Sequence, residues 1–153
     1  MSTDLRYQIY SDNSESTVSL AEALAKNLRG GEVIEMIGDL GAGKTTFVSG
    51  LARALGYAGP VTSPTFSLLN VYKTAFLINH FDLYRLEDIG EVKHEIDEAI
   101  SQPGAITIIE WAKQIEYIDD LIKIQLQSQP DENKRKITIS APSKYSYITE
   151  GLA

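Results

Sequence analysis

The sequence predicts a three-layer α/β sandwich, with helices on both faces of a sheet that mixes parallel and antiparallel strands. Apolar runs typical of strands alternate along the chain with stretches whose apolar residues recur at helical spacing. One of these strands is joined to a helix by a glycine-rich turn. The length of 153 residues suits one ordinary domain, so we expect a single domain over residues 1–153.

The first expected elements are a strand and a helix. Leu5–Tyr10 fits a short strand, and the Ser, Asp and Asn residues within Ser11–Thr17 are suited to cap the helix that follows. That helix is expected to end at Gly30 and Gly31, because glycine interrupts helical spacing. Its apolar face would contain Val18, Ala21, Leu24, Ala25 and Leu28.

A second strand and helix enclose the glycine-rich turn. Val33–Ile37 is a short apolar run that predicts a mostly buried strand, and Gly38–Gly43 forms the turn. The next helix is expected to begin at Lys44 and to end before Gly56, since glycine is favoured just beyond a helix end. Its apolar face would contain Phe47, Val48, Leu51, Ala52 and Leu55.

The middle of the chain predicts a hairpin and a helix. After a loop over residues 59–64 that contains Gly and Pro, the strand-like runs Phe66–Tyr72 and Ala75–Phe81 lie only a few residues apart. They are therefore expected to pair as an antiparallel hairpin. Acidic and apolar residues alternate at helical spacing over Leu86–Ile100, and Pro103–Gly104 ends that predicted helix.

Three more strands complete the predicted sheet. Ala105–Ile109 is an apolar run, and Leu121–Leu126 and Lys136–Ser140 flank a polar loop. Because some strands are joined by tight turns and others by helices, the sheet is expected to be mixed, with helices on both faces.

Composition limits the kinds of function. The net charge is -7, so the chain has no overall positive field for a nucleic-acid backbone, and a role on RNA would need a basic partner. The sequence has no cysteine, which excludes a thiolate metal site and a cysteine nucleophile and favours the cytoplasm. No run approaches the ~20 apolar residues that span a bilayer, so no membrane association or secretion is expected.

The turn carries the strongest chemical signal. Gly38-Asp39-Leu40-Gly41-Ala42-Gly43-Lys44-Thr45 matches G-x-x-x-x-G-K-[ST], the phosphate-binding loop of P-loop NTPases, and it lies between a predicted strand and a predicted helix. Its glycines let backbone N–H groups face a phosphate, and the helix N-terminus adds a positive dipole end. Lys44 would neutralise the β- and γ-phosphates and Thr45 would bind Mg²⁺. The expected nucleotide contacts are Asp39, Leu40, Gly41, Ala42, Gly43, Lys44, Thr45 and Thr46.

Two acids follow apolar strands and are candidate partners of the metal. Glu110 ends the run Ile106–Ile109 in the arrangement of a Walker B acid, and Asp82 ends the run Phe76–Phe81. Both carboxylates are candidate ligands of Mg²⁺ or of its water shell, and the less favoured alternative for each is a solvated acid at a strand end. Together with Lys44 they form the expected catalytic set.

Four further features are harder to assign from the residues alone. Ser63–Thr65 is either a nucleotide-sensing switch or a rigid turn, and Arg85 is either an arginine finger or one partner of a surface ion pair. Trp111 could cover a nucleotide, dock a partner or pack in the core. A lone histidine on an apolar strand is usually a packing residue, so His80 is given no catalytic role.

These blocks together resemble one family, the bacterial TsaE (formerly YjeE) proteins. The similar segments are Gly38–Phe47, Ser63–Phe66, His80–Leu86 and Ile109–Trp111, within a resemblance that extends from about Thr17 to Ile139. A phosphate-binding loop is common to many families. The His-Phe-Asp-Leu-Tyr-Arg and Ile-Glu-Trp blocks are much more specific, so the resemblance depends mainly on them.

The resemblance implies a small P-loop ATPase that uses ATP and Mg²⁺ in the threonylcarbamoylation of adenosine in certain tRNAs. Proteins of this family act with TsaB and TsaD, and TsaD transfers the group, so contact with tRNA would be indirect. By motif, Lys44 and Thr45 would hold phosphate and Mg²⁺ and Glu110 would be the Walker B acid. Asp82 and Trp111 would be further functional positions.

Other functions remain open on the residues alone. A small-molecule kinase could use the same loop, although such enzymes usually have a lid with several arginines and the five arginines here are scattered. A docking module could use bound ATP only to order Ser63–Thr65. The base of the nucleotide has no compact sequence signal, and Lys134 or Arg135 could stack on it or reach a phosphate.

Overall fold

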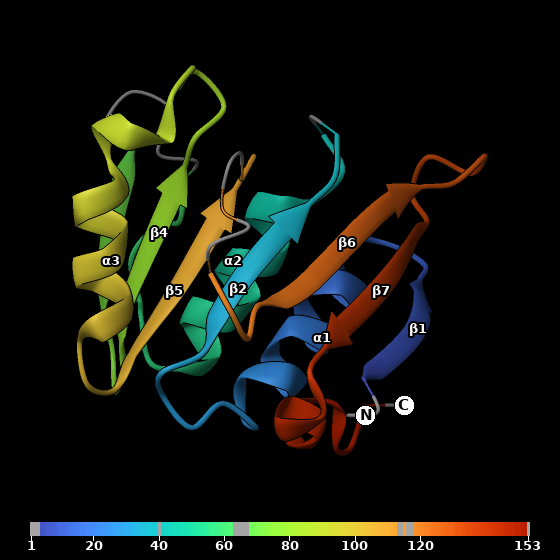
Figure 1. Ribbon diagram of the computed structural model, residues 1–153. Coiled ribbons are helices and arrows are strands. Elements are labelled where there is room, and N and C mark those ends of the chain that lie inside the picture. Colours follow the sequence, from blue (N-terminus) through green and yellow to red (C-terminus); the bar gives the residue numbers. More distant parts are fainter. Residues whose placement is uncertain (1–3, 40, 63–67, 113–114, 116–117, 153) are drawn as a thin grey trace.

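The computed structural model of the protein describes residues 4–39, 41–62, 68–112, 115 and 118–152. They form one sheet of seven strands with helices on both faces, which confirms the predicted mixed α/β sandwich (Figure 1). The order across the sheet is β1-β7-β6-β2-β5-β4-β3. The strands are β1 (Leu5–Ser11), β2 (Val33–Ile37), β3 (Leu69–Lys73), β4 (Leu77–Asp82), β5 (Ala105–Glu110), β6 (Ile122–Ser128) and β7 (Arg135–Ala141).

The central strands are parallel and the outer ones are antiparallel. β2 lies between β5 and β6 and is parallel to both, and β4 is parallel to β5. β3, β7 and β1 each pair antiparallel with their neighbours. Asp82 is in register with Glu110, and Glu110 with Met36, so β2, β4 and β5 end at the same edge of the sheet. Ligand sites of open α/β sheets form at this edge.

Two helices pack side by side on one face of the sheet. α1 (Ser14–Ala25) is capped by the side chain of Asn13, which accepts a hydrogen bond of 2.8 Å from the Ser16 N–H. α2 (Lys44–Ala54) approaches α1 closely at Gly50, where an added Cβ would lie 2.8 Å from the Val18 carbonyl oxygen. Only glycine permits this distance between the helices.

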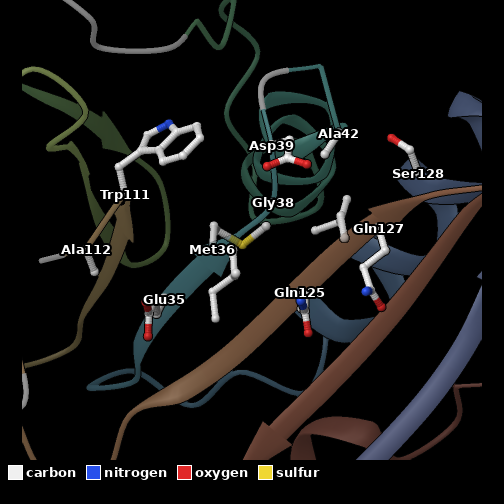
Figure 2. Close-up of a pocket in the computed structure, with 12 residues that line it drawn as sticks. Glu35, Met36, Gly38, Asp39, Ala42, Trp111, Ala112, Gln125, Gln127 and Ser128 are labelled. Carbon is white, nitrogen blue, oxygen red and sulfur yellow. The ribbon is translucent and has the colours of Figure 1, made fainter.

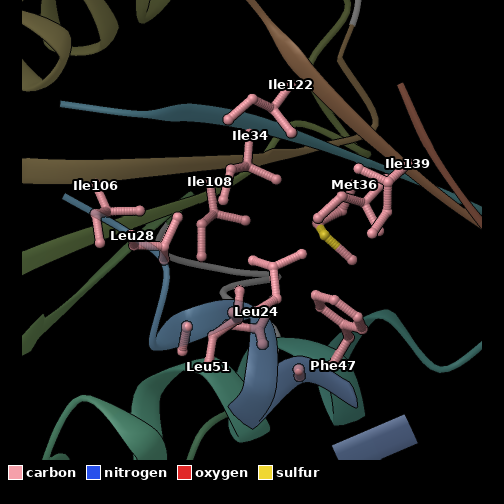
Figure 3. Close-up of a cluster of buried hydrophobic side chains, with 14 of the residues drawn as sticks. Leu24, Leu28, Ile34, Met36, Phe47, Leu51, Ile106, Ile108, Ile122 and Ile139 are labelled. Carbon is pink, nitrogen blue, oxygen red and sulfur yellow. The ribbon is translucent and has the colours of Figure 1, made fainter. Parts of the chain in front are cut away.

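The hydrophobic core has two parts, one on each face of the sheet. The larger part fills the space between the sheet and helices α1 and α2, where Leu24, Phe47 and Leu51 face the isoleucines of the strands (Figure 3). The smaller part lies under α3 (Lys93–Ser101) and includes Phe81 and Ile96. This smaller part of the core packs against β4 and β5. It thereby holds Asp82 and Glu110 in fixed positions relative to the rest of the sheet.

The third helix is shorter than the sequence predicts. The expected helix over Leu86–Ile100 is divided into a 3₁₀ turn, η1 (Ile89–Glu91), and α3, with Val92 in a non-helical conformation between them. The Asp88 side chain accepts a 2.8 Å hydrogen bond from the Gly90 N–H, and this local turn competes with a continuous helix.

Other boundaries also differ from expectation: α1 ends at Ala25, before the expected stop at Gly30 and Gly31. β3 begins at Leu69 rather than Phe66, and Leu68 has a left-handed backbone with φ of 66° that no strand accommodates. Phe66 lies outside the described residues. A 3₁₀ segment, η2 (Ser143–Thr149), was not predicted at all. Among the described residues, no helix is both long enough and apolar enough to cross a membrane.

The contact at Gly50 predicts the effect of a single methyl group. We expect Gly50→Ala to lower the free energy of unfolding by about 1–3 kcal/mol, because the added Cβ has no space between Ala21 and the backbone of α1. Urea denaturation measures the change. Ser49→Ala on the same helix is the control and should differ from the unaltered chain by less than about 0.5 kcal/mol. Equal stability of Gly50→Ala and the control would show that the helices can move apart at no cost.

Candidate functional site

The glycine-rich turn connects β2 to α2 as the sequence predicts. Gly41 and Gly43 have φ values of 81° and 102°, in the left-handed region that glycine adopts without strain. An added Cβ at Gly38 would lie 2.8 Å from the Leu126 carbonyl oxygen, so this position also needs glycine. Within the turn, the Ala42 N–H donates to the Asp39 carbonyl over 3.0 Å. Leu40 lies outside the described residues.

Lys44 is a buried cation without a hydrogen bond. Its side chain is 6% exposed and its Nζ is the one buried side-chain nitrogen or oxygen without a hydrogen-bond partner in the part of the chain that the structure describes. Nζ lies 3.8 Å from Glu110 Oε1 and 3.6 Å from the centre of the Trp111 ring. Burial lowers the pKa of Lys44, and the negative charges of Glu110, Asp82 and Asp39 offset this only in part.

Glu110 is fixed by a histidine from the neighbouring strand. Glu110 ends β5, and its Oε2 lies 2.5 Å from Nε2 of His80, which is completely buried on β4. The other ring nitrogen of His80, Nδ1, lies 3.3 Å from the Tyr72 hydroxyl on β3. That hydroxyl donates to the Thr62 carbonyl over 3.2 Å. One carboxylate oxygen is thus held by His80 while the other faces Lys44.

His80 was missed by the reasoning from sequence, which considered it only as a packing residue. It stands two residues before Asp82 on the same strand, so both side chains lie on one face of β4. This spacing of two is the signal that could have identified it. Its contact with Glu110 depends on β5 being the neighbouring strand, and local sequence does not give that information.

Asp82 occupies the equivalent strand end beside Glu110. It is 4% exposed, and its Oδ1 accepts a 3.0 Å hydrogen bond from the Tyr84 N–H. This bond fixes the carboxylate at the point where the chain leaves β4. Asp82, Glu110 and Lys44 are therefore brought together from three different elements.

These side chains line one cavity of about 510 Å³ at the edge of the sheet. The cavity contains most of the residues that the sequence predicts for the site. Arg85 also lines it, whereas Ser63–Thr65 lies outside the described residues. The full lining is Gly41, Gly43, Lys44, Thr45, Thr46, Asp82, Tyr84, Arg85, Glu110 and Trp111.

Trp111 lines this cavity, is only partly buried and is not part of the hydrophobic core. Its backbone φ is 55°, and its ring packs on Tyr84 with 4.9 Å between ring centres. The same residue borders a second cavity of about 450 Å³ between the turn and β6. Figure 2 shows Trp111 across this cavity from Asp39 and Ala42 of the turn and from Gln127 of β6.

A smaller cavity of about 210 Å³ lies against the turn on the side of α1 and β7. Gly41, Gly43 and Thr46 line both this cavity and the one that contains Lys44. The remaining lining comes from Asn13, Ser14, Thr17, Glu132, Asn133 and Arg135. The turn thus separates the cavity that contains Lys44 from a second polar cavity, which has room for a further part of a ligand.

The candidate metal ligands form an open arrangement. Among the described residues, no group of three or more His, Asp or Glu side chains is gathered as a preformed metal centre. Mg²⁺ is commonly held by one or two carboxylates together with phosphate oxygens and water, so Thr45, Asp82 and Glu110 are a suitable set.

Comparison with known proteins identifies the family of the chain. Residues 11–137 match the family model described as threonylcarbamoyl adenosine biosynthesis protein TsaE. The chain is similar to tRNA threonylcarbamoyladenosine biosynthesis protein TsaE of Aquifex aeolicus (strain VF5), with 40% identity over 139 residues, which cover 89% of this chain and 97% of that protein. The protein of the same name from Bacillus subtilis (strain 168) is 36% identical over 146 residues, covering 92% and 90%.

A solved structure has the same fold. The crystal structure of Bacillus subtilis YdiB superposes with a TM-score of 0.75 and 30% sequence identity, and the match covers 98% of this chain and 94% of that chain. The family model and the relatives both extend over most of the chain. The chain therefore belongs to the TsaE family.

Proposed function

We propose that this protein is a Mg²⁺-dependent ATPase that takes part in the biosynthesis of threonylcarbamoyladenosine in tRNA. The observation that carries the proposal is the ammonium group of Lys44, which is buried at the start of α2 and makes no hydrogen bond. A buried charge without hydrogen bonds is costly, and an anionic ligand in the adjacent cavity would remove the cost.

The residues present suit a bound nucleotide and its metal. The turn and the first residues of α2 would hold the phosphates, with Lys44 donating hydrogen bonds to their oxygens. Thr45, Asp82 and Glu110 would hold Mg²⁺, which when bound neutralises part of the phosphate charge. The nucleoside would extend past Thr46 into the cavity beside α1 and β7, because both cavities border that residue.

The chain's own groups account for the chemistry of hydrolysis. Glu110 orients the attacking water, and its hydrogen bond to His80 keeps the carboxylate in one orientation. Lys44 and the backbone amides of the turn stabilise negative charge on the phosphoryl group. Trp111 and Tyr84 pack on each other in the lining of the cavity, where they would limit the access of other water.

The pathway and partners are proposed from family membership. The relatives are named as tRNA threonylcarbamoyladenosine biosynthesis proteins, and we assign this chain the same role. We further propose that it acts with TsaB and TsaD, contacts tRNA only through them, and functions in the cytoplasm. A net charge of -7 agrees with an indirect contact with tRNA.

A nucleotide-gated docking module is the second candidate. The specific observation in its favour is Tyr84, an aromatic residue that is 45% exposed beside the nucleotide cavity and contacts Trp111. Exposed aromatic residues next to a ligand site are suited to contact a partner. In this candidate, ATP binding alone would switch the docking surface and hydrolysis would not be required.

Replacing Lys44 separates binding from stability. We expect Lys44→Met to weaken Mg²⁺-ATP binding by about a hundredfold, the effect of losing charged hydrogen bonds of roughly 1.5–3 kcal/mol. In the unaltered chain the pKa of Lys44 is lowered, so the folded chain holds the Lys44 proton less tightly than the unfolded chain does. The charge of Lys44 therefore costs stability at neutral pH. This cost declines as the pH rises through the pKa of Lys44 in the folded chain. Lys44→Met should therefore unfold at the same urea concentration or a higher one.

Isothermal titration calorimetry and urea denaturation measure the two effects of Lys44→Met. Unchanged ATP affinity in this variant would contradict the assignment of the phosphate site. A loss of stability would instead show that Lys44 is needed to neutralise Glu110 and Asp82 in the folded state.

Replacing Glu110 distinguishes the two candidate functions. We expect Glu110→Gln to bind ATP and to hydrolyse it about 10²–10⁴-fold more slowly, because the amide cannot act as a base. ATPase rate and tRNA modification are both measured with TsaB and TsaD present. If hydrolysis is required, modification falls with the ATPase rate. Full modification without hydrolysis would support the docking module and contradict the proposed ATPase function.

Replacing His80 tests how Glu110 is oriented. His80→Gln retains a side-chain N–H that can reach Glu110, whereas His80→Leu removes it. We expect the leucine variant to lower kcat by ~10–100-fold with little change in ATP affinity, and the glutamine variant to recover much of the rate. Steady-state kinetics provide both parameters. Equal kcat values in the leucine variant and the unaltered chain would show that the contact has no role in turnover.

A further inference from the structure

Arg135 connects the phosphate-binding turn to β7, which lies two strands from β2 and begins at the edge of the sheet where β2 ends. It is the first residue of β7 and follows the polar loop after β6. Its Nε donates to the Ala42 carbonyl over 2.9 Å, and its Nη2 donates to the Gly41 carbonyl over 3.2 Å. Its Nη1 donates to the carbonyls of Glu132 and Lys134 over 2.6 and 2.8 Å. The guanidinium thus faces four backbone oxygens rather than lying free to stack on a base.

These contacts determine which way the peptide groups of the turn point. In a trans peptide, the C=O and the N–H of the next residue point in opposite directions. With the Ala42 oxygen directed at Arg135, the N–H of Gly43 points away from Arg135. The carbonyl oxygens of Gly41 and Ala42 would repel an anion. Their hydrogen bonds to Arg135 hold them away from the side of the turn that faces the phosphate. The arrangement suits a loop that binds phosphate through its amides.

The turn needs such support because of its glycines. Gly41 and Gly43 are in the left-handed region, and glycine residues populate many alternative conformations at little cost. In each alternative conformation the amides of the turn would point elsewhere, and the turn could not bind phosphate. The measured affinity for a ligand is lower when a smaller fraction of the chains has the binding conformation. A side chain that fixes two consecutive carbonyls therefore raises that fraction.

We propose that Arg135 is a positioning residue that holds the phosphate-binding turn in its binding conformation before nucleotide arrives. The inference rests on the proposed function, because it concerns the same turn. The fork-shaped guanidinium is essential to it, since one ammonium group cannot reach carbonyls on the turn and on the β6–β7 loop together. The role differs from a direct contact with phosphate, in which the charge alone would matter.

The test compares Arg135→Lys and Arg135→Gln with the control Arg6→Gln. Arg6 is exposed on β1 and pairs with Ser140, at the opposite end of the β1–β7 ladder from Arg135, which pairs with Ser11. The first measurement is hydrogen exchange in the chain without nucleotide. We expect the Ala42 amide, which donates to the Asp39 carbonyl within the turn, to exchange about tenfold faster in both Arg135 variants, with exchange in β2 and β5 and in the control unchanged.

The second measurement is binding and turnover of Mg²⁺-ATP. Both Arg135 variants should bind about tenfold more weakly, while kcat at saturating ATP changes by less than about twofold, since bound nucleotide restores the turn. A role in overall folding would instead change exchange throughout the sheet. If Arg135→Gln lowers the melting temperature, Arg135→Lys, which keeps the charge and the aliphatic stem, provides the comparison.

Two results would overturn the inference. Normal affinity in Arg135→Lys would show that positive charge, rather than the fork, is what matters. Unchanged exchange of the Ala42 amide in both variants would show that the turn keeps its conformation without Arg135. If the unaltered chain bound no nucleotide, the proposed function would fail, and hydrogen exchange would still decide whether Arg135 holds the turn.

Discussion

The site depends on one buried cation that the fold leaves without a hydrogen bond. Lys44 begins α2 at the edge of the sheet where β2, β4 and β5 end, so its ammonium group meets carboxylates from two neighbouring strands. Desolvation of that ammonium exceeds the attraction of the carboxylates, as the lowered pKa indicates. Such a site is more favourable with an anion bound than without one, and this difference is available to bind a nucleotide.

Side chains from the neighbouring strands keep this site in a single arrangement. On one side His80 of β4 holds Glu110, and Tyr72 of β3 holds His80 in turn. On the other side Arg135 of β7 holds the carbonyls of the turn. The groups that would touch a nucleotide are therefore supported from both directions across the sheet. The two cores, one under α1 and α2 and one under α3, fix the strands that carry these supports.

The sequence predicts the parts of the fold and site whose signals are local. The turn and its lysine are contiguous, and the acids Asp82 and Glu110 can be found because each ends an apolar strand. The contact of His80 with Glu110 depends on β4 and β5 being neighbours, and that of Arg135 with the turn depends on how the β6–β7 loop packs, so neither could be predicted. The shortening of α3 reflects competition between a helix and the Asp88 turn, and propensity alone does not resolve it.

The most direct test of the central claim is a crystal structure of the chain with Mg²⁺ and a non-hydrolysable ATP analogue. We expect Nζ of Lys44 to lie within about 2.7–3.2 Å of a phosphate oxygen and to have left its position over the Trp111 ring. An analogue bound elsewhere, with Lys44 still over Trp111 and still without a hydrogen bond, would contradict the account.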